Sequence, residues 1–433
     1  MGKDPNLQRF EPDIDRIQRD LLALSHMTSP TEPGYTRLSF TDEDRKAREY
    51  VVRLMEDEAR LTVRMDPVGN LIGRREGQKE RPALLLGSHL DTVRGGGRFD
   101  GISGVIAGIE VARRFREKDV TNIHPIEVVV FVAEEPSPFG LSTIGSRGMA
   151  GKLSCEILKS LTDGAGRTLE QAIREIGGDP SNIIKAKRSR ADILAYLELH
   201  IEQGPYLYSK SIPIGVVTGI FGILRGKAEA IGISDHSGTT SMEARRDALA
   251  AAAEAILALE RICANLKGVV GTIGKVEVFP NATNVIPGKT ILYMEMRSLS
   301  EDLLNEAATI FRNELRMIEE KRGVRMLFEW SISSKPVIFD QSMVERMTRV
   351  CEELGVPYVK LSSGAGHDAN HLAEVAPTGM IFVPSKEGRS HCPEEWTEFE
   401  EIRLGTEVLA CVAEVMDSET SPFDRPVDFK GKD

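Results

Sequence analysis

Cysteine is scarce in this chain of 433 residues. Its five cysteines are far apart, and no C-x-x-C pair occurs. An odd number of scattered cysteines argues against a disulfide framework and against a cysteine-only zinc site, and it fits a reduced, cytoplasmic protein. Four of them are interpreted as core thiols, whereas Cys392 adjoins a histidine of interest and is left open.

The chain also lacks an excess of positive charge, and it lacks long apolar runs. Lys and Arg total 55 against 66 Asp and Glu, which gives a net charge of −11, and no Lys/Arg-rich run is present. A polyanion binder needs a basic face, so we expect no nucleic acid partner. No apolar run reaches the roughly 18 residues of a membrane span, and the first residues resemble neither a secretory nor a myristoylation signal. We therefore expect a globular protein of two or three domains with no membrane partner.

Strand and helix signals alternate in the first part of the chain. Continuous apolar runs at 82–88, 126–135 and 192–203 predict buried strands, and the apolar spacing within 101–118 predicts a helix. Such alternation is typical of an α/β fold with a mostly parallel sheet flanked by helices.

The middle of the chain follows the order β-α-β-β-α-β, the split βαβ unit of a ferredoxin-like α+β domain. Its two helices are predicted at 242–262 and 300–322, the second with Ser300 as N-cap. After this stretch the chain returns to helix–strand alternation. We predict a discontinuous catalytic domain of residues 1–211 and 330–433, interrupted by an inserted domain of residues 212–329.

The glycine-rich segment 87–104 follows the first predicted strand, and sites in α/β sheets form at the carboxyl ends of strands. His89 can ligate a metal through one ring nitrogen while Asp91 holds the other, and Asp100 can bridge two cations. A surface turn with incidental acids explains this segment equally well.

Two adjacent glutamates, Glu134 and Glu135, end the strand predicted at 126–135. Adjacent strand residues point to opposite faces unless the strand ends there, so one carboxylate can bind a metal while the other meets a water. Two acids at the mouth of an apolar strand are costly unless they are paired or coordinated. A solvated strand exit is the alternative.

Three further segments carry histidines near strand ends: His200 in LELHIEQG, His391 in GRSHCPEE, and His367 with Asp368 in SSGAGHDANH. Considered separately, each segment has an ordinary explanation. His200 can be a strand-end histidine with its hydrogen bonds satisfied, His391 a surface loop residue, and His367 with Asp368 the cap of the helix that follows. Taken together, three histidines and two or three carboxylates form a nitrogen–oxygen donor set without thiolates. Such a set suits Zn²⁺ and also Mn²⁺, Co²⁺ or Ni²⁺.

The motifs GSHLDT, GGRFDGISGV, the EE pair, LELHIEQGP, HSGTT, NVIPG, SGAGHDA and SHCPEE follow one another between about residues 15 and 415. In this order they resemble the hydantoinase/carbamoylase group of dinuclear metal amidohydrolases, relatives of aminoacylase and carboxypeptidase G. The resemblance implies an N-carbamoyl-L-amino acid hydrolase, with allantoate amidohydrolase and β-ureidopropionase as alternatives. It also implies a zinc-exopeptidase-like catalytic domain, two divalent metal ions per subunit, and a homodimer formed through the inserted lid domain.

The resemblance also assigns roles to individual residues. One metal would be held by His89, Asp100 and His200, and the other by Asp100, Glu135 and His391. Glu134 would be the general base, Asp91 would orient His89, and His236 would stabilise the oxyanion in its own or the partner's site. The substrate, a small molecule with a ureido group and a carboxylate, would be bound by Gln203, Asn284, Arg297, Gly364, Ala365, His367 and Asp368.

Three positions depart from the family pattern: Pro138 stands where Arg is common, Ser241 replaces Pro, and Arg389 replaces an aliphatic residue. Each concerns the shape of the pocket, so the sequence determines the substrate less well than the reaction. Arg389 is a candidate to bind an additional acid on the substrate. Two rival functions are an aminoacylase or dipeptidase, which usually has a carboxylate at the position of His200, and a non-catalytic relative, which would have lost the base or a ligand.

Overall fold

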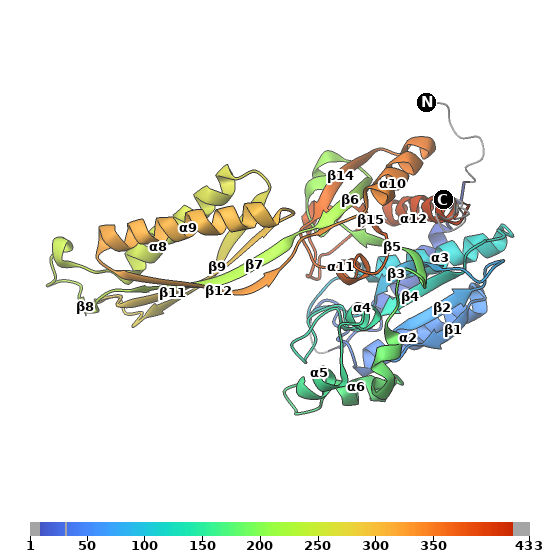
Figure 1. Ribbon diagram of the computed structural model, residues 1–433, viewed down its shortest axis with the longest axis horizontal. Helices are drawn as coiled ribbons and strands as arrows, with labels where there is room; N and C mark the ends of the chain where they lie inside the picture. Colours follow the sequence, from blue (N-terminus) through green and yellow to red (C-terminus); the bar gives the residue numbers. More distant parts are fainter. Residues whose placement is uncertain (1–8, 31–32, 419–433) are drawn as a thin grey trace, which may run out of the picture. The chain divides into compact units, whose positions relative to one another are not determined.

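The computed structural model describes residues 9–30 and 33–418 and divides into two compact units (Figure 1). The first unit contains the chain up to Thr218, residues 339–361, and the chain from Gly366 onward. The second unit contains Gly219–Ile338 and Ser362–Ala365. Each unit is described by itself below.

A nine-stranded mixed sheet lies mainly in the first unit. Its strands are β1 (Thr62–Met65), β2 (Leu71–Arg75), β3 (Ala83–His89), β4 (Ile126–Phe131), β5 (Ile193–Ile201), β6 (Ile214–Ile220), β13 (Val337–Ile338), β14 (Tyr358–Ser363) and β15 (Thr378–Val383). The short strand β13 and the last residues of β6 are counted with the second unit. They lie in the order β1-β2-β4-β3-β5-β15-β6-β13, with β14 beside β6. Parallel pairs join β4, β3, β5 and β15, whereas the pairs of β1, β2, β6 and β13 are antiparallel. The predicted α/β sheet is confirmed, and its four central strands pair in parallel.

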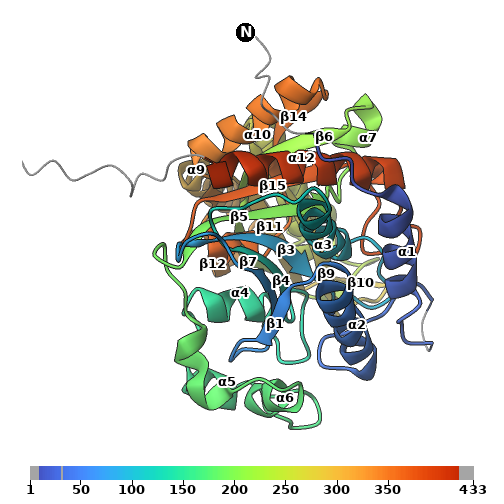
Figure 2. The same cartoon turned by 90° about the vertical axis from the view of Figure 1, so that its right-hand side faces the viewer.

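Helices cover the sheet, and α3 and α12 contact its central strands (Figure 2). Strands β3 and β4 are buried along their whole length, which explains why they are continuous apolar runs. Among the described residues, no helix has the length and apolar character needed to cross a membrane. The helices of this unit are α1 (Ile14–Ser25), α2 (Asp42–Arg53), α3 (Ile102–Glu117), α4 (Ile144–Met149), α5 (Cys155–Ser160), α6 (Leu169–Glu175), α7 (Tyr206–Lys210), α10 (Gln341–Leu354), α11 (Ala369–Leu372) and α12 (Phe399–Ser418).

The strand predicted at 126–135 is too long, because β4 ends at Phe131. Ala133 then takes a left-handed conformation with φ of 52°, and the chain leaves the sheet before the two glutamates. The main chain of residues 143–145 donates hydrogen bonds to the carbonyls of residues 132–134 and fixes this exit. The period-2 argument about adjacent strand residues therefore does not apply to Glu134 and Glu135.

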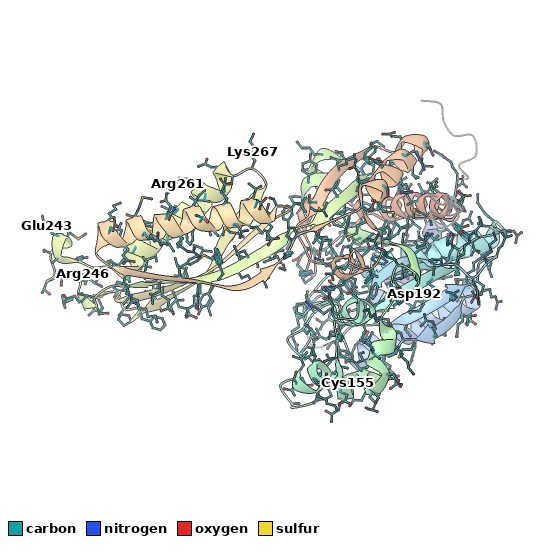
Figure 3. All side chains as sticks on the ribbon, in the orientation of Figure 1. Cys155, Asp192, Glu243, Arg246, Arg261 and Lys267 are labelled. Atoms are coloured by element: carbon teal, nitrogen blue, oxygen red, sulfur yellow. The ribbon has the colours of Figure 1, made fainter. Side chains whose placement is uncertain are left out.

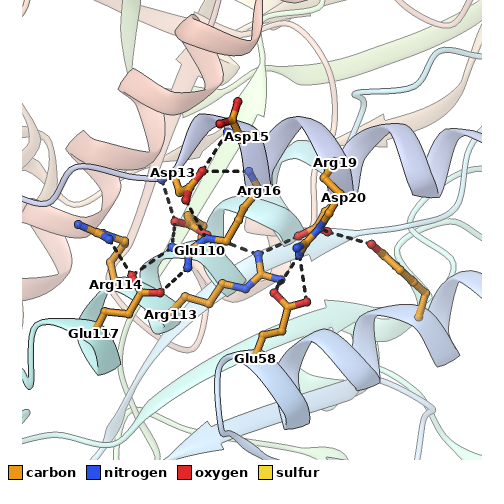
Figure 4. Close-up of polar contacts among 11 residues, drawn as sticks. Asp13, Asp15, Arg16, Arg19, Asp20, Glu58, Glu110, Arg113, Arg114 and Glu117 are labelled. Atoms are coloured by element: carbon orange, nitrogen blue, oxygen red, sulfur yellow. Dashed lines mark hydrogen bonds and ion pairs between the residues drawn. The ribbon is translucent and has the colours of Figure 1, made fainter.

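An ion-pair network joins α1 to α3 in the first unit (Figure 4). At its centre is Arg113, whose side chain is fully buried and lies 2.8 Å from Asp20, 2.7 Å from Glu58 and 3.4 Å from Glu110. Arg113, Asp20, Glu58 and Glu110 each have two or more partners of opposite sign, which offsets the cost of removing these charges from water. The network therefore anchors α3, the helix that begins two residues after Asp100.

Glu127 on β4 provides a test of buried charge in this unit. Burial by itself raises a carboxyl pKa, but ion pairs with Arg188, Arg74 and Arg64 hold the pKa of Glu127 below its ordinary value. Its contribution to stability is therefore present above the ordinary pKa of 4.5 and is lost as the pH falls through the lower folded value. We expect Glu127→Gln to cost about 3 kcal/mol at pH 7. The difference in melting temperature from the parent should shrink at acidic pH, whereas a Gln at Glu76, an exposed partner of Arg74, should change little.

The second unit is a four-stranded antiparallel sheet of order β12-β7-β11-β9 with two helices and a small ribbon. Its elements are β7 (Gly222–Ile231), β8 (Asp235–His236), α8 (Ala248–Asn265), β9 (Val269–Phe279), β10 (Val285–Ile286), β11 (Lys289–Ser298), α9 (Glu301–Arg322) and β12 (Arg325–Ser334). The predicted order β-α-β-β-α-β is confirmed, and Ser300 caps α9 by accepting a hydrogen bond from the Leu303 main chain. The apolar faces of α8 and α9 pack with the sheet in one core. Arg261, labelled on α8 in Figure 3, donates a hydrogen bond to Glu314 of α9 at 2.8 Å.

Two predicted boundaries in this region differ from the structure. The helix predicted from residue 242 begins only at Ala248, because the side chain of Asp247 accepts hydrogen bonds from the main chain of residues 249 and 250 and forms the N-cap. The insertion predicted at 212–329 is displaced, since β6 still pairs with β15 of the first unit and β12 extends to Ser334.

Candidate active site

Asp100 lies at the centre of the candidate site. Its Oδ1 atom is 3.5 Å from Nε2 of His89 and 3.2 Å from Nε2 of His200. Its Oδ2 atom is 3.1 Å from Nε2 of His391, which is itself 3.4 Å from a carboxylate oxygen of Glu135. The donor atoms of His89, Asp100 and His200, and likewise those of Asp100, Glu135 and His391, lie within 4.8 Å of one another. The structure thus brings together all five predicted metal ligands in two groups that share Asp100.

Hydrogen bonds to the main chain hold two of these histidines in the tautomer that a metal ligand needs. Nδ1 of His89 lies 3.0 Å from the carbonyl oxygen of Asp91, and Nδ1 of His200 lies 2.9 Å from that of Ile201. A carbonyl oxygen only accepts, so each Nδ1 carries the proton and each Nε2 keeps its lone pair. The main chain of Gly101 donates to Nε2 of His200 at 3.2 Å, which agrees with this assignment.

Glycine is required at position 101 for two reasons. Its φ of +69° is in the left-handed region, and a Cβ there would lie 2.3 Å from Nε2 of His89. The N-terminus of α3 can therefore lie directly beside the imidazole, and this brings Asp100 to the histidines. The glycine-rich sequence after β3 is thus a feature of the site and not only a surface turn.

The carboxylate of Asp91 holds the glutamate pair more closely than it holds His89. Its oxygens accept from the main-chain nitrogens of Glu134 at 3.2 Å and Glu135 at 3.0 Å, and from the hydroxyl of Ser39 at 2.7 Å. The same carboxylate is 3.6 Å from Nδ1 of His89, whose hydrogen bond goes to the Asp91 main chain instead. Asp91 thereby fixes both glutamates relative to β3.

The two glutamates differ in their surroundings. Glu135 belongs to the second donor group, whereas Glu134 places Oε2 3.8 Å from Nε2 of His89 and belongs to neither group that contains Asp100. Burial raises the pKa of Glu134 well above its ordinary value, and it raises the pKa of Glu135 to about 7. A carboxyl with a raised pKa takes up a proton more readily than an ordinary carboxylate does, which suits the role of a general base.

The charges of the site fit divalent cations. Among the described residues, the ion pairs of Asp100, Glu134 and Glu135 are with histidines rather than with Lys or Arg. The neighbouring Asp100 carboxylate raises the pKa of His391 to about 9, so this position favours a positive charge. The imidazole and carboxylate donors, without thiolates, suit Zn²⁺ and also Mn²⁺, Co²⁺ or Ni²⁺. The identity of the metal stays a prediction.

Three predicted substrate residues lie beside these donor groups. Nε2 of Gln203 is 2.6 Å from Oδ2 of Asp100 and 3.3 Å from Nε2 of His391, so Gln203 directly contacts the second group. The ring of His367 packs edge-on against that of His200 with centroids 4.5 Å apart. Asp368 is fully buried, and burial together with the charge of Glu198 raises its pKa to about 8. It precedes α11 without forming a side-chain cap, so the capping alternative is wrong for this residue.

The other predicted substrate residues lie in the second unit. His236 is on β8 and pairs with β10, next to Asn284, whose carbonyl oxygen accepts from the Ser237 main chain at 3.1 Å. Arg297 on β11 donates to the carbonyl oxygen of Gly364. Two small groups, His236 with Asn284 and Arg297 with Gly364 and its neighbour Ala365, are thus formed within this unit. Their substrate roles stay predictions.

Three of the polar residues that hold the site together were not predicted from the sequence: Ser39, Ser390 and Glu395. Ser39 binds Asp91, and Ser390 and Glu395 bind Asp100 and its main chain. Ser390 and Glu395 are the first and last residues of the SHCPEE motif, and this motif was the only signal available for them. Ser39 carries no such signal.

The three residues that depart from the family pattern have exposed side chains. Pro138 and Ser241 are exposed, and Ser241 precedes a short 3₁₀ turn, Met242–Ala244. Arg389 forms an ion pair with Glu394 at 3.0 Å. An additional acid on a substrate would therefore compete with Glu394 for Arg389.

Comparison with known proteins decides the family. The profile of Peptidase family M20/M25/M40 matches residues 85–415. The chain belongs to this family. An N-carbamoyl-L-amino acid amidohydrolase of Geobacillus stearothermophilus is 40% identical over 396 residues, which are 91% of this chain and 96% of the relative. Allantoate amidohydrolase of Escherichia coli is 33% identical, over 91% of this chain and 96% of the relative.

The solved structures place this M20 family member within one branch. An amidase of the hydantoinase/carbamoylase family from Burkholderia multivorans has a TM-score of 0.89 and 34% identity, and the match covers 95% of this chain and all of that one. The predicted resemblance to the hydantoinase/carbamoylase group is confirmed. The chain is accordingly a hydrolase of the amidohydrolase branch of the M20 family, whose members act on C–N bonds outside peptides.

Proposed function

We propose that this M20 family amidohydrolase cleaves the ureido C–N bond of an N-carbamoyl-L-amino acid and yields the amino acid, CO₂ and ammonia. The observation that carries the proposal is the sharing of Asp100 between two donor groups with Glu134 beside them. The similarity to the Geobacillus enzyme supports the substrate class. Allantoate and β-ureidopropionate, which also combine a ureido group with a carboxylate, are the alternatives.

Two divalent ions would be held by His89, Asp100 and His200 and by Asp100, Glu135 and His391. When bound, they would supply the Lewis acidity that lowers the pKa of water and polarises a carbonyl. The chain itself supplies the movement of protons. Glu134 takes the proton of the attacking water and returns it to the leaving nitrogen of the amino acid. Gln203 and the loop of His367 are assigned to the carbamoyl group.

His236 is assigned to the developing oxyanion. The Gly238 main chain donates to Nδ1 of His236 at 3.0 Å, so the neutral ring carries its proton on Nε2. This proton can be donated to a negatively charged oxygen, whereas the opposite tautomer would offer only a lone pair. Arg297 and Asn284 are assigned to the substrate carboxylate, which the planar guanidinium can pair through two bonds.

Replacing His236 by alanine is expected to lower kcat by about 100-fold, the effect of removing one oxyanion donor. The content of bound metal should stay unchanged, because His236 lies outside both donor groups. Steady-state kinetics and metal analysis of the same preparation test this together. His26→Ala, at another exposed histidine, is the control. A loss of metal in His236→Ala would instead make His236 a ligand.

The function itself is tested by measuring ammonia release from N-carbamoyl-L-amino acids, allantoate and β-ureidopropionate with Mn²⁺, Co²⁺, Ni²⁺ and Zn²⁺ in turn. Release from N-carbamoyl-L-amino acids at the highest kcat/KM supports the proposal. No release from any ureido compound, with cleavage of N-acyl amino acids, would favour the aminoacylase rival. The second unit is assigned the role of lid and homodimerisation domain, which the mass of the protein in solution tests.

A further inference from the structure

Glu395 is a buried carboxylate that contacts both segments carrying the second donor group. It is only 1% exposed. Its Oε1 atom accepts from the main-chain nitrogens of Phe99 at 2.9 Å and Asp100 at 3.2 Å. Two successive amides thus converge on one oxygen, and this fixes the main chain directly at the shared ligand.

The second oxygen of Glu395 reaches the loop of His391. The hydroxyl of Ser390 lies 2.8 Å from Oε2 of Glu395 and 3.1 Å from Oδ2 of Asp100. Ser390 precedes His391, whose φ of 56° is a left-handed conformation that a non-glycine residue adopts only when its surroundings hold it there. The carboxylate of Glu395 is therefore connected to Asp100 through the main chain and through Ser390.

The glycine-rich loop packs closely against Glu395. A Cβ at Gly97 would lie 2.0 Å from the carboxylate of Glu395, so the glycine-rich loop is shaped around this side chain. The rings of Phe99 and Trp396 meet edge-to-face with centroids 5.4 Å apart, and Phe399 lies 5.9 Å from Phe99. These aromatic contacts join the same two segments without the carboxylate, so they should keep the fold when Glu395 is replaced.

A buried carboxylate close to another acid is expensive, and the partners of Glu395 are amides and a hydroxyl rather than a cation. Proteins retain a destabilising buried group of this kind where a functional site requires it. We propose that Glu395 is a positioning residue: it fixes the Asp100 main chain and the His391 loop so that the two oxygens of Asp100 face different donor groups. The inference rests on the proposed metal-dependent function, but it concerns the metal centre and not the substrate.

The test compares Glu395→Ala, Glu395→Gln and Glu394→Ala in protein loaded with Co²⁺. Chelator competition measures Co²⁺ affinity, and the visible absorption spectrum reports the geometry around the ion. Glu395→Ala is expected to weaken the more loosely held ion by about 10–100-fold and to change the spectrum, because ligands lose their supporting hydrogen bonds. Glu395→Gln should restore most of the Co²⁺ affinity and most of the parent spectrum, since its side-chain oxygen can still accept hydrogen bonds from the main-chain nitrogens of Phe99 and Asp100. Glu394→Ala is the matched control, because Glu394 is the exposed neighbour that pairs with Arg389.

Native affinity and spectrum in Glu395→Ala would overturn the proposal, and so would a Glu395→Gln variant as defective as Glu395→Ala. If Glu395→Ala does not fold, Ser390→Ala serves the same test: the proposal expects it to shift the Co²⁺ spectrum and weaken one ion, and an unchanged metal centre would overturn it. Neither readout uses a substrate. A metal centre that responds as expected in a protein without ureido hydrolysis would therefore refute the proposed function and leave the role of Glu395 standing.

Discussion

Replacing Glu134 by glutamine is expected to lower kcat by about 10²–10⁴-fold while both metal ions stay bound. Glutamine has nearly the same shape but cannot take a proton, so proton transfer from the attacking water and to the leaving nitrogen would both be lost. The five predicted ligands are untouched, and Glu134 is not a member of either group built on Asp100. The measurement is kcat on the substrate selected by the ammonia screen, together with metal analysis.

The same substitution at the neighbouring Glu135 gives a different expected result, which makes it a matched comparison. Glu135→Gln should lose metal from the group formed with Asp100 and His391, whereas Glu134→Gln should lose turnover alone. Glu202→Gln is a further control, because the Glu202 carboxylate accepts from the main chain of Tyr206 and Leu207 and lies in neither group. Turnover of Glu134→Gln within a few-fold of the parent would remove Glu134 as the base.

Asp100→Ala is expected to abolish the binding of both metal ions, with a fall in affinity well beyond the about 10–100-fold typical of changes outside the ligands. One oxygen of Asp100 faces His89 and His200 and the other faces His391, so a single substitution removes a donor from each group. Activity should fall to background. Metal content after dialysis and titration with Zn²⁺ measure the loss.

Single-group variants distinguish a shared ligand from a generally damaged site. His391→Ala should weaken one ion and His200→Ala the other, so each should retain about one ion per chain under conditions in which Asp100→Ala retains none. Full metal content in Asp100→Ala would contradict the bridging role. Loss of both ions from His391→Ala would instead show that the two donor groups bind their ions cooperatively.

Much of the fold was predictable, because long apolar runs and helical spacing carry their own signal. Strands β3, β4 and β5 and helices α3 and α9 were expected within a few residues of their observed bounds. The errors occurred where a local hydrogen bond overrides the pattern. Asp247 caps α8 and delays its start, and the left-handed Ala133 ends β4 before the acids that seemed to continue it.

The metal donors were predictable for a topological reason. His89 is the last residue of β3, His200 is the penultimate residue of β5, and Glu135 follows β4; these three neighbouring strands are parallel, and parallel strands end at the same edge of a sheet. A chemically suitable residue at the end of such a strand, or just after it, is thereby close to its counterparts, even when more than 40 residues separate them in the sequence. His391 follows β15, the next parallel strand along the sheet.

The sequence by itself determined the class of this protein: the order of strands and helices, the donor residues at the strand ends, and the family motifs. The tertiary structure decided how those donors are held. It showed that Asp91 binds the glutamate main chain, that Asp100 divides its oxygens between two groups, and that Glu395 supports Asp100. Contacts of this kind join a side chain to the main-chain amides of a distant loop. Every residue but proline has such an amide, so the sequence carries no mark of which ones will meet.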